Sequence, residues 1–297
     1  MPLHPKVAEI LATLPPPPAE LDPVAMRGFE ESQVAPLEER LPIDSVEDTS
    51  YAGVPVRVYT PADASDDVLV YLHGGAFFLG SLNTHDHIAR SLADATGRQV
   101  VSVGYRLAPE HPFPAGLDDC FAVVKHLLDA GRTVAVAGDS SGGTYAAAVA
   151  GLVTDAGLPG LSHQVLYYPS LDLRFAESIE SGRYPSLKEN AEGNGLTTAG
   201  LLPFNSFYLR SADPTDPRVS PILREDLSGL PRTLIVTAEM DPLRDEGELY
   251  GEKLKAAGVD VTVTRVAGAA HGFVQHFSWL PEFGAVFGET AAFLKGA

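Results

Sequence analysis

The sequence predicts an α/β fold built on a mostly parallel sheet. Short runs rich in β-branched residues are typical of buried strands. The chain contains six of them after its first 60 residues: DVLVYLHGG, RQVVSVGY, TVAVAGD, HQVLYYP, TLIVTAE and DVTVTRV. Segments of helical length alternate with these runs, near residues 84–97, 115–130, 141–156, 243–258 and 281–295. Such alternation requires crossover connections, which place helices on both faces of a parallel sheet.

The first 60 residues follow a different pattern. Apolar residues recur at helical spacing between Val7 and Leu14, and the run 15–18 should end this helix because proline lacks a backbone N–H. A second helical stretch covers about residues 22–34. The segment IDSVEDTSYAGVPVRVYTP indicates two strands joined by a turn at residues 52–53, which would add antiparallel strands at one edge of the sheet.

One connection is longer than a crossover needs. About 60 residues separate HQVLYYP from TLIVTAE, where a handful would suffice. We expect an insertion over about residues 172–212, with a helical piece near 197–210. The predicted organisation is therefore residues 1–42 as N-terminal helices, which pack with the insertion to form a cap, and residues 43–297 as the main domain.

The composition excludes several classes of protein. The formal net charge is −18 over 297 residues, so the surface should repel nucleic acids. Cys120 is the only cysteine, which excludes an internal disulfide and a multi-cysteine metal cluster and suits a reducing cytoplasm. The sequence lacks a signal-peptide pattern and a run of about twenty apolar residues. We expect a cytoplasmic protein that binds neither nucleic acid nor metal and does not span a membrane.

A candidate nucleophile lies where a buried strand meets an alanine-rich helix. Residues 138–142, Gly-Asp-Ser-Ser-Gly, match G-x-S-x-G, which in this context forms a strained turn that exposes the central hydroxyl. Ser140 is therefore the candidate. Ser141 is excluded as the nucleophile because Asp139 stands where its upstream glycine should be.

The partners of a serine nucleophile follow in the expected order. The backbone N–H groups of Gly74 and Gly75, in a glycine-rich loop after a strand, could bind an oxyanion together with the N–H of Ser141. Asp241 comes just after one later strand and His271 after the next, which gives the chain order Ser, Asp, His. The rivals are Asp245, which suits a helix N-terminus, and His276, which suits packing against the last helix.

These motifs together resemble the hormone-sensitive-lipase-like carboxylesterases, the bacterial family IV esterases, in their G-D-S-A-G branch. The matching segments are YLHGGAFFLGSLNTHD, YRLAPEHPFPAGLDD, GDSSGG, DPRVSPI, LPRTLIVTAEMDPLRDEGELY and HGF. The resemblance implies an α/β-hydrolase fold with an eight-stranded sheet and a helical cap. It also implies Ser140 as nucleophile, Asp241 as acid and His271 as base, with Gly74, Gly75 and Ser141 as oxyanion donors.

The implied activity is a serine carboxylesterase that hydrolyses short to medium acyl esters through an acyl-enzyme intermediate, without a cofactor and with a homodimer as one possible assembly. Ala76 stands where the family usually has a third glycine, Ser141 where it has alanine, and Tyr145 where it has a smaller aliphatic residue. The candidate residues of the substrate pocket are Ala76, Phe77, Asp139, Tyr145 and Tyr184.

Two other functions use the same fold. An amidase would use the same three residues, whereas a small-molecule-binding relative would lack the catalytic histidine that this sequence keeps as His271. Two further groups of charged or titratable residues have structural interpretations. Arg106, Glu110, Asp118 and Asp119 are expected to form an ion-paired brace, and the triplet 85–87, His-Asp-His, is expected at the surface or at a helix cap.

Overall fold

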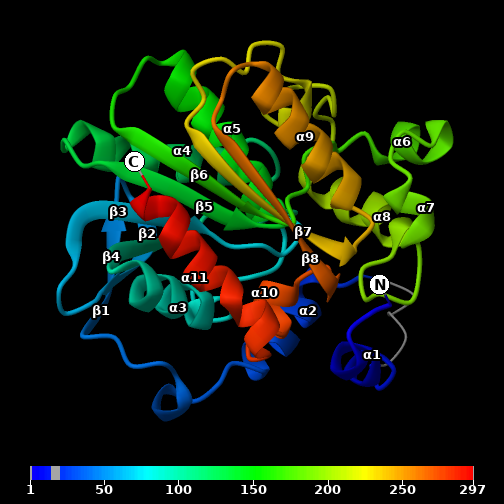
Figure 1. Cartoon of the computed structure of the whole chain (residues 1–297), viewed down its shortest axis with the longest axis horizontal. Coiled ribbons are helices and arrows are strands. Elements are labelled where there is room, and N and C mark those ends of the chain that lie inside the picture. Colours follow the sequence, from blue (N-terminus) through cyan, green and yellow to red (C-terminus); the bar gives the residue numbers. More distant parts are fainter. Residues whose placement is uncertain (1, 15–20, 297) are drawn as a thin grey trace.

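The computed structural model describes residues 2–14 and 21–296, and its centre is an eight-stranded sheet (Figure 1). The strand order is β1-β2-β4-β3-β5-β6-β7-β8. The first two strands form an antiparallel hairpin, β2 is antiparallel to β4, and all other neighbours are parallel. The strands are β1 Ser45–Tyr51, β2 Val54–Thr60, β3 Ser65–Leu72, β4 Arg98–Val103, β5 Val134–Asp139, β6 Leu161–Tyr167, β7 Arg232–Met240 and β8 Val261–Ala270. The predicted eight-stranded α/β-hydrolase sheet is confirmed.

Helices cover both faces of this sheet. The helices of the main domain are α3 Asp86–Thr96, α4 Ala115–Asp129, α5 Ser141–Asp155, α9 Arg244–Ala256, α10 Phe273–His276 and α11 Pro281–Lys295. Successive residues of a strand point to opposite faces, so Val70 and Leu72 join a core with α4, α5 and α9, whereas Leu69 and Tyr71 join a second core with α3 and α11. Figure 1 shows α3 and α11 side by side on one face. Strands buried on both faces explain why their sequences are apolar throughout.

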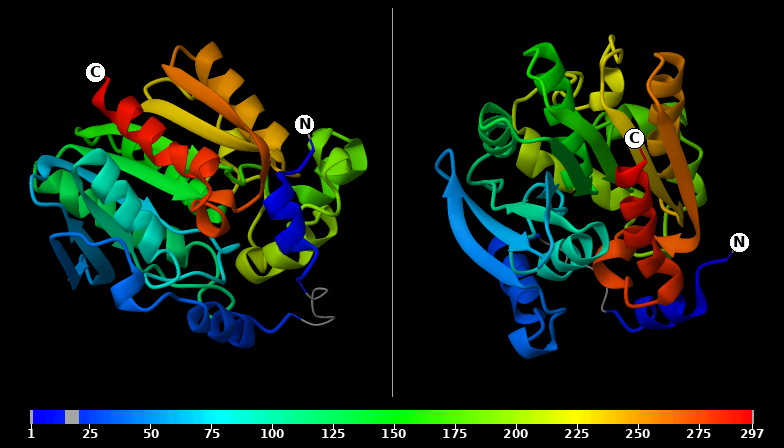
Figure 2. Two further views of the ribbon diagram at one scale, coloured as in Figure 1. Left: turned by 60° about the horizontal axis from the view of Figure 1, so that its bottom comes forward. Right: turned by 60° about the vertical axis from the view of Figure 1, so that its left-hand side comes forward.

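The remaining helices come from two separate parts of the chain. They are α1 Pro5–Leu11, α2 Pro23–Ser32 and the 3₁₀ turn η1 Leu37–Glu39 near the N-terminus, and α6 Phe175–Ser181, α7 Ser186–Glu189, α8 Thr198–Leu209 and η2 Pro221–Leu223 between β6 and β7. In both views of Figure 2 the N-terminal helices lie at the end of the molecule where β7 and β8 have their carboxyl ends. The sequence predicted α8 but missed α6, α7 and α10, because helices of four to seven residues are too short to show periodicity. The predicted helix stop at residues 15–18 lies outside the described residues.

Candidate active site

Ser140 lies in a strained turn between β5 and α5. Its backbone has φ 54° and ψ −119°, a conformation that costs energy for any residue with a Cβ. The turn is tight because the residues two positions before and after Ser140 are glycines: a Cβ on Gly142 would overlap the backbone of Leu72 and His73, and one on Gly138 would overlap the backbone of Gly142. The glycines that interrupt the apolar run therefore permit the tight turn, and the turn exposes the serine hydroxyl at the end of the sheet.

Three side chains from the ends of three strands form one hydrogen-bonded chain. Ser140 Oγ lies 2.9 Å from His271 Nε2, and His271 Nδ1 lies 2.8 Å from Asp241 Oδ2. Since a carboxylate only accepts hydrogen bonds, the imidazole proton is on Nδ1, and Nε2 can accept the serine proton. The Asp241 side chain is fully buried, and its second oxygen accepts the N–H of Leu243 at 2.8 Å.

Neither of the two rival residues belongs to this chain of hydrogen bonds. Asp245 lies in the first turn of α9, accepts the N–H of Ser186 at 2.7 Å and pairs with Arg244 at 2.8 Å. His276 ends the short helix α10, one turn beyond His271. The structure thus brings Ser140, Asp241 and His271 together and leaves the rivals outside this hydrogen-bonded chain.

The glycine-rich loop after β3 differs from the sequence prediction at one donor. The N–H of Gly74 donates to Asp139 Oδ1 at 2.8 Å, so this donor already has an acceptor and is not free for an oxyanion. The N–H of Phe77 donates to Ser141 Oγ at 3.2 Å. Between them, Gly75 and Ala76 adopt positive φ angles of 119° and 50°. Within the part of the chain that the structure describes, the N–H groups of Gly75 and Ala76 have no hydrogen-bond acceptor.

The five residues predicted to line the substrate pocket are mostly packed inside the protein. The ring of Phe77 stacks on Tyr208 with centroids 3.8 Å apart, and Tyr145 meets its edge at 5.2 Å. Tyr184 is buried and donates to Asp172 at 2.7 Å. Asp139 is 1% exposed, and Ala76 is partly buried beside the same core.

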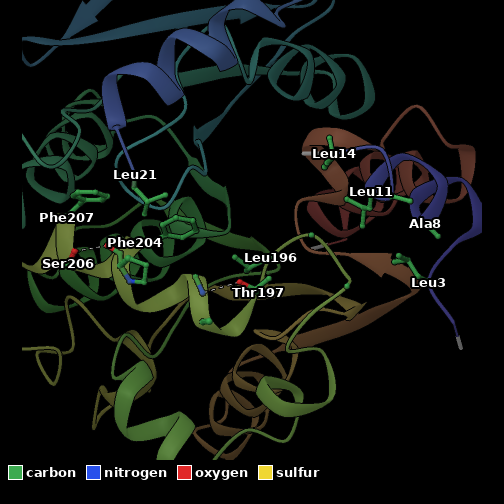
Figure 3. A pocket seen from close by; sticks show the side chains of 16 residues that line it. Leu3, Ala8, Leu11, Leu14, Leu21, Leu196, Thr197, Phe204, Ser206 and Phe207 are labelled. Carbon is green, nitrogen blue, oxygen red and sulfur yellow. Dashed lines mark hydrogen bonds between the residues drawn. The ribbon is translucent and has the colours of Figure 1, made fainter. Parts of the chain in front are cut away.

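A cavity of about 1030 Å³ opens between α1 and α8, and none of those five residues lines it. In Figure 3, Leu11 and Leu14 lie on one side of the cavity, Phe204 and Phe207 lie on the other, and Leu196 lies between them. Phe204 and Phe207 also contact the ring of Phe78, two residues after Ala76, at 5.5 and 4.9 Å. The sequence signal for this wall is the apolar stretch LLPFNSFYL, which lies in the helical piece predicted for the cap.

Contacts that the sequence did not reveal join the outer segments to the site. Arg27 of α2 donates from Nε to the carbonyl of Phe78 at 2.7 Å and from Nη2 to the carbonyl of Ala108 at 2.5 Å. Asn190, just after α7, donates to the carbonyl of Asp241 at 3.1 Å. Both Asp241 and the glycine-rich loop thus form hydrogen bonds with segments outside the sheet.

The predicted ion-paired brace is present in part, and among the described residues Asp118 has no ion pair. Arg106 binds Asp119 through two bonds of 2.8 Å, whereas Glu110 pairs with Arg27 of α2 at 2.8 Å. Glu110 therefore fastens the N-terminal segment, which sequence order could not indicate.

The triplet 85–87 meets the expectation only in part: His85 is the N-cap residue of α3 but its side chain forms no cap hydrogen bond, and the side chains of His85 and Asp86 are buried. His85 is fully buried beside His73, with ring centroids 5.2 Å apart, and Asp86 is 2% exposed and accepts the hydroxyl of Tyr59 at 2.8 Å. These side chains face inward because α3 packs on the sheet. Burial lowers the pKa of His73 to about 4 and raises the pKa of Asp139 to about 6, since both groups lose the hydration of their charged forms.

Comparisons with known proteins identify relatives of this chain. Residues 69–275 match a family model described as alpha/beta hydrolase fold. A carboxylesterase of Mycobacterium tuberculosis is 40% identical over 257 residues, which cover 82% of this chain and 78% of the relative. An arylesterase of Saccharolobus solfataricus is 38% identical over 231 residues, covering 74% of this chain and 73% of that protein.

Solved structures give the same result. A hyperthermophilic esterase from the archaeon Pyrobaculum calidifontis superposes with a TM-score of 0.89 at 37% identity, covering 99% of this chain and 98% of that one.

Among the described residues, the helices are all too short or too polar to cross a bilayer.

Proposed function

The chain belongs to the hormone-sensitive-lipase-like carboxylesterases of the α/β-hydrolase fold and is a carboxylic ester hydrolase, and from this premise we propose that Ser140, His271 and Asp241 are its catalytic triad. The observation that carries the proposal is the chain of two hydrogen bonds, 2.9 Å from Ser140 to His271 and 2.8 Å from His271 to Asp241. In this arrangement the acid orients the histidine, and the histidine can take the proton of the serine hydroxyl, which makes the serine a nucleophile.

In the proposed reaction, Ser140 Oγ attacks the ester carbonyl while His271 Nε2 takes the hydroxyl proton. Asp241 holds the imidazole in the required tautomer and stabilises its positive charge. Collapse of the tetrahedral intermediate breaks the bond to the alcohol oxygen, which receives the proton from His271. A water molecule then gives one proton to His271 and attacks the acyl carbonyl carbon. The bond from that carbon to Ser140 Oγ breaks, the acid leaves, and His271 returns the proton to Oγ.

For the oxyanion we propose the backbone N–H groups of Gly75, Ala76 and Ser141. Gly74 is replaced in this role because its N–H is bonded to Asp139. The free N–H groups of Gly75 and Ala76, and the position of Ser141 as the first residue of α5, support this set. A methyl group at Ala76 does not remove a donor, since the donor is the backbone.

We propose a small-molecule ester with a short to medium acyl chain as the substrate, covered by a cap made of residues 1–42 and about 172–212. The apolar lining of the cavity between α1 and α8 supports this substrate class. The contact of Phe204 and Phe207 with Phe78 supports a connection from that cavity to the glycine-rich loop. We further propose a cytoplasmic location. We also propose a homodimer through the sheet edge or the last helix, and light scattering would test this dimer.

The experiment is hydrolysis of p-nitrophenyl esters from acetate to palmitate by the wild type and Ser140→Ala. By analogy with serine-protease triads, Ser140→Ala should lower kcat on the order of a million-fold. Ser141→Ala is the matched control, because it removes the neighbouring hydroxyl and keeps the backbone N–H, and it should lose less than about tenfold. Near-normal turnover by folded Ser140→Ala would overturn the triad, and a preference for matched anilides over esters would indicate an amidase.

A further inference from the structure

Asp139 is a buried carboxylate that the reaction itself does not use. It ends β5, directly before the nucleophile Ser140, and is 1% exposed. Its Oδ1 accepts the hydroxyl of Tyr71 at 2.5 Å and the N–H of Gly74 at 2.8 Å. Its Oδ2 lies 3.5 Å from the hydroxyl of Tyr168 and 3.9 Å from Nε2 of His85. One side chain thus joins the nucleophile turn to the glycine-rich loop.

The glycine-rich loop needs such a connection. Gly75 and Ala76 follow Gly74 and both have positive φ, at 119° and 50°, and the value at Ala76 is costly for a residue with a Cβ. Such a conformation persists only where its surroundings fix it. The Gly74 N–H lies at the start of this stretch, and its approach to Asp139 is so close that a Cβ on Gly74 would overlap the Asp139 carboxylate.

The bond is also a strong one. A hydrogen bond from a backbone N–H to an ionised carboxylate is about twice as strong as a neutral one. Burial raises the pKa of Asp139 to about 6, whereas the bonds from Tyr71 and Gly74 lower it, so the carboxylate is ionised at neutral pH. The protein therefore keeps a buried charge at this position and directs a loop N–H toward it.

We propose that Asp139 is a positioning residue, whose hydrogen bond to the Gly74 N–H fixes the direction of the Gly75 and Ala76 N–H groups relative to Ser140. The inference rests on the proposed triad and oxyanion donors. It assigns Asp139 neither to the substrate pocket nor to proton transfer, because both of its oxygens face protein groups. Loss of this bond lets the loop turn, and the donors then fit the oxyanion less well while substrate binding changes little.

The test compares Asp139→Ala and Asp139→Asn, with kcat expressed per active site labelled to completion by a fluorophosphonate. Asp139→Ala cannot reach Gly74 and should lower kcat on the order of 100-fold, with KM within about threefold, as for loss of an oxyanion donor. Asp139→Asn keeps an oxygen that can accept from Gly74 and should recover to within about tenfold of the wild type. If Asp139→Ala does not fold, Asp139→Ser takes its place, because the serine side chain is also too short to reach the Gly74 N–H.

A trifluoromethyl ketone provides the readout that a purely structural role would leave unmoved. It forms a tetrahedral adduct on Ser140 whose oxygen occupies the oxyanion position, so its inhibition constant should rise in parallel with the fall in kcat/KM. The control is Asp86→Ala, which also removes a buried carboxylate bonded to a tyrosine, through Tyr59 at 2.8 Å. It should lower the melting temperature but keep kcat within about threefold of the wild type.

The outcomes separate this inference from the proposed function. An Asp139→Ala enzyme with kcat within about threefold of the wild type, or with an unchanged ketone constant, overturns the positioning role. A loss in Asp86→Ala equal to that in Asp139→Ala overturns it as well, because the effect is then general. A Ser140→Ala enzyme that keeps activity overturns the proposed triad instead.

Discussion

Acidification should weaken the fold through His73, which is buried in its neutral form. The residue is 1% exposed, and its Nδ1 lies 2.8 Å from the carbonyl of Gly74, which can only accept, so Nδ1 carries the proton. Burial lowers the pKa of His73 from 6.5 to about 4. In the unfolded chain this histidine takes up a proton below about pH 6.5, whereas the folded protein excludes that proton until about pH 4. The stabilisation is therefore complete above this window and is lost as the pH falls through it.

The size of the effect follows from the two pKa values. Between pH 7 and pH 5 the neutral His73 should remove about 2 kcal/mol from the free energy of unfolding. Asp139 acts in the opposite direction, because its folded pKa of about 6 lies above the ordinary aspartate value of 3.8. Its contribution is present in acid and lost as the pH rises through 6, and over the same interval it should return about 1 kcal/mol. The protein should therefore lose stability on acidification, and His73 should be one contributor beside His276, whose pKa burial also lowers to about 4.

The assay is urea unfolding followed by far-UV circular dichroism at pH 7 and pH 5, for the wild type and His73→Asn. The asparagine amide can still donate to the carbonyl of Gly74 but does not titrate. His73→Asn should be less stable than the wild type at pH 7, yet its loss between pH 7 and pH 5 should be smaller by about 2 kcal/mol. An equal pH-dependent loss in both proteins refutes the reasoning, and so does an NMR titration in which the His73 ring protonates above pH 6.

Two further predictions concern the nucleophile turn and the N-terminal segment. Gly142→Ala should lower the free energy of unfolding by about 3 kcal/mol or more, because its Cβ meets the backbone of Leu72 and His73, which cannot move aside. Gly151→Ala in the same helix approaches the end of the flexible Arg224 side chain at 3.3 Å and should be neutral or stabilising. Urea unfolding of both variants checks this, and equal losses contradict the account. Arg27→Ala should lower the free energy of unfolding by about 2 kcal/mol and reduce kcat/KM, since the carbonyls of Phe78 and Ala108 lose their donor. Glu110→Gln keeps those two bonds and should cost less than about 1 kcal/mol in urea unfolding, and a larger loss there than in Arg27→Ala would contradict this.

Local patterns were sufficient to predict the architecture, the family and the esterase activity. The buried strands are runs of apolar, β-branched residues, and five segments long enough for helices alternate with them. The predicted sheet and its antiparallel edge are confirmed. The motif around Ser140, and the positions of Asp241 and His271 just after strands, were readable because parallel strands bring their carboxyl ends to one edge of the sheet. The family and the esterase activity predicted from these motifs are confirmed by the relatives.

Tertiary structure decided which groups face one another across distant segments. The sequence offered Gly74 as an oxyanion donor, but only the fold shows that Asp139, 65 residues later, takes its N–H. Likewise Phe77 and Tyr145 were assigned to a pocket, yet they pack on Tyr208 in the core, and the apolar cavity lies between α1 and α8. The spacing of apolar residues in the sequence indicates only which residues share a face of one strand or helix. Burial and hydrogen-bond partners depend on segments that the chain brings together only on folding, and these set the direction of each donor and the pKa of each buried group.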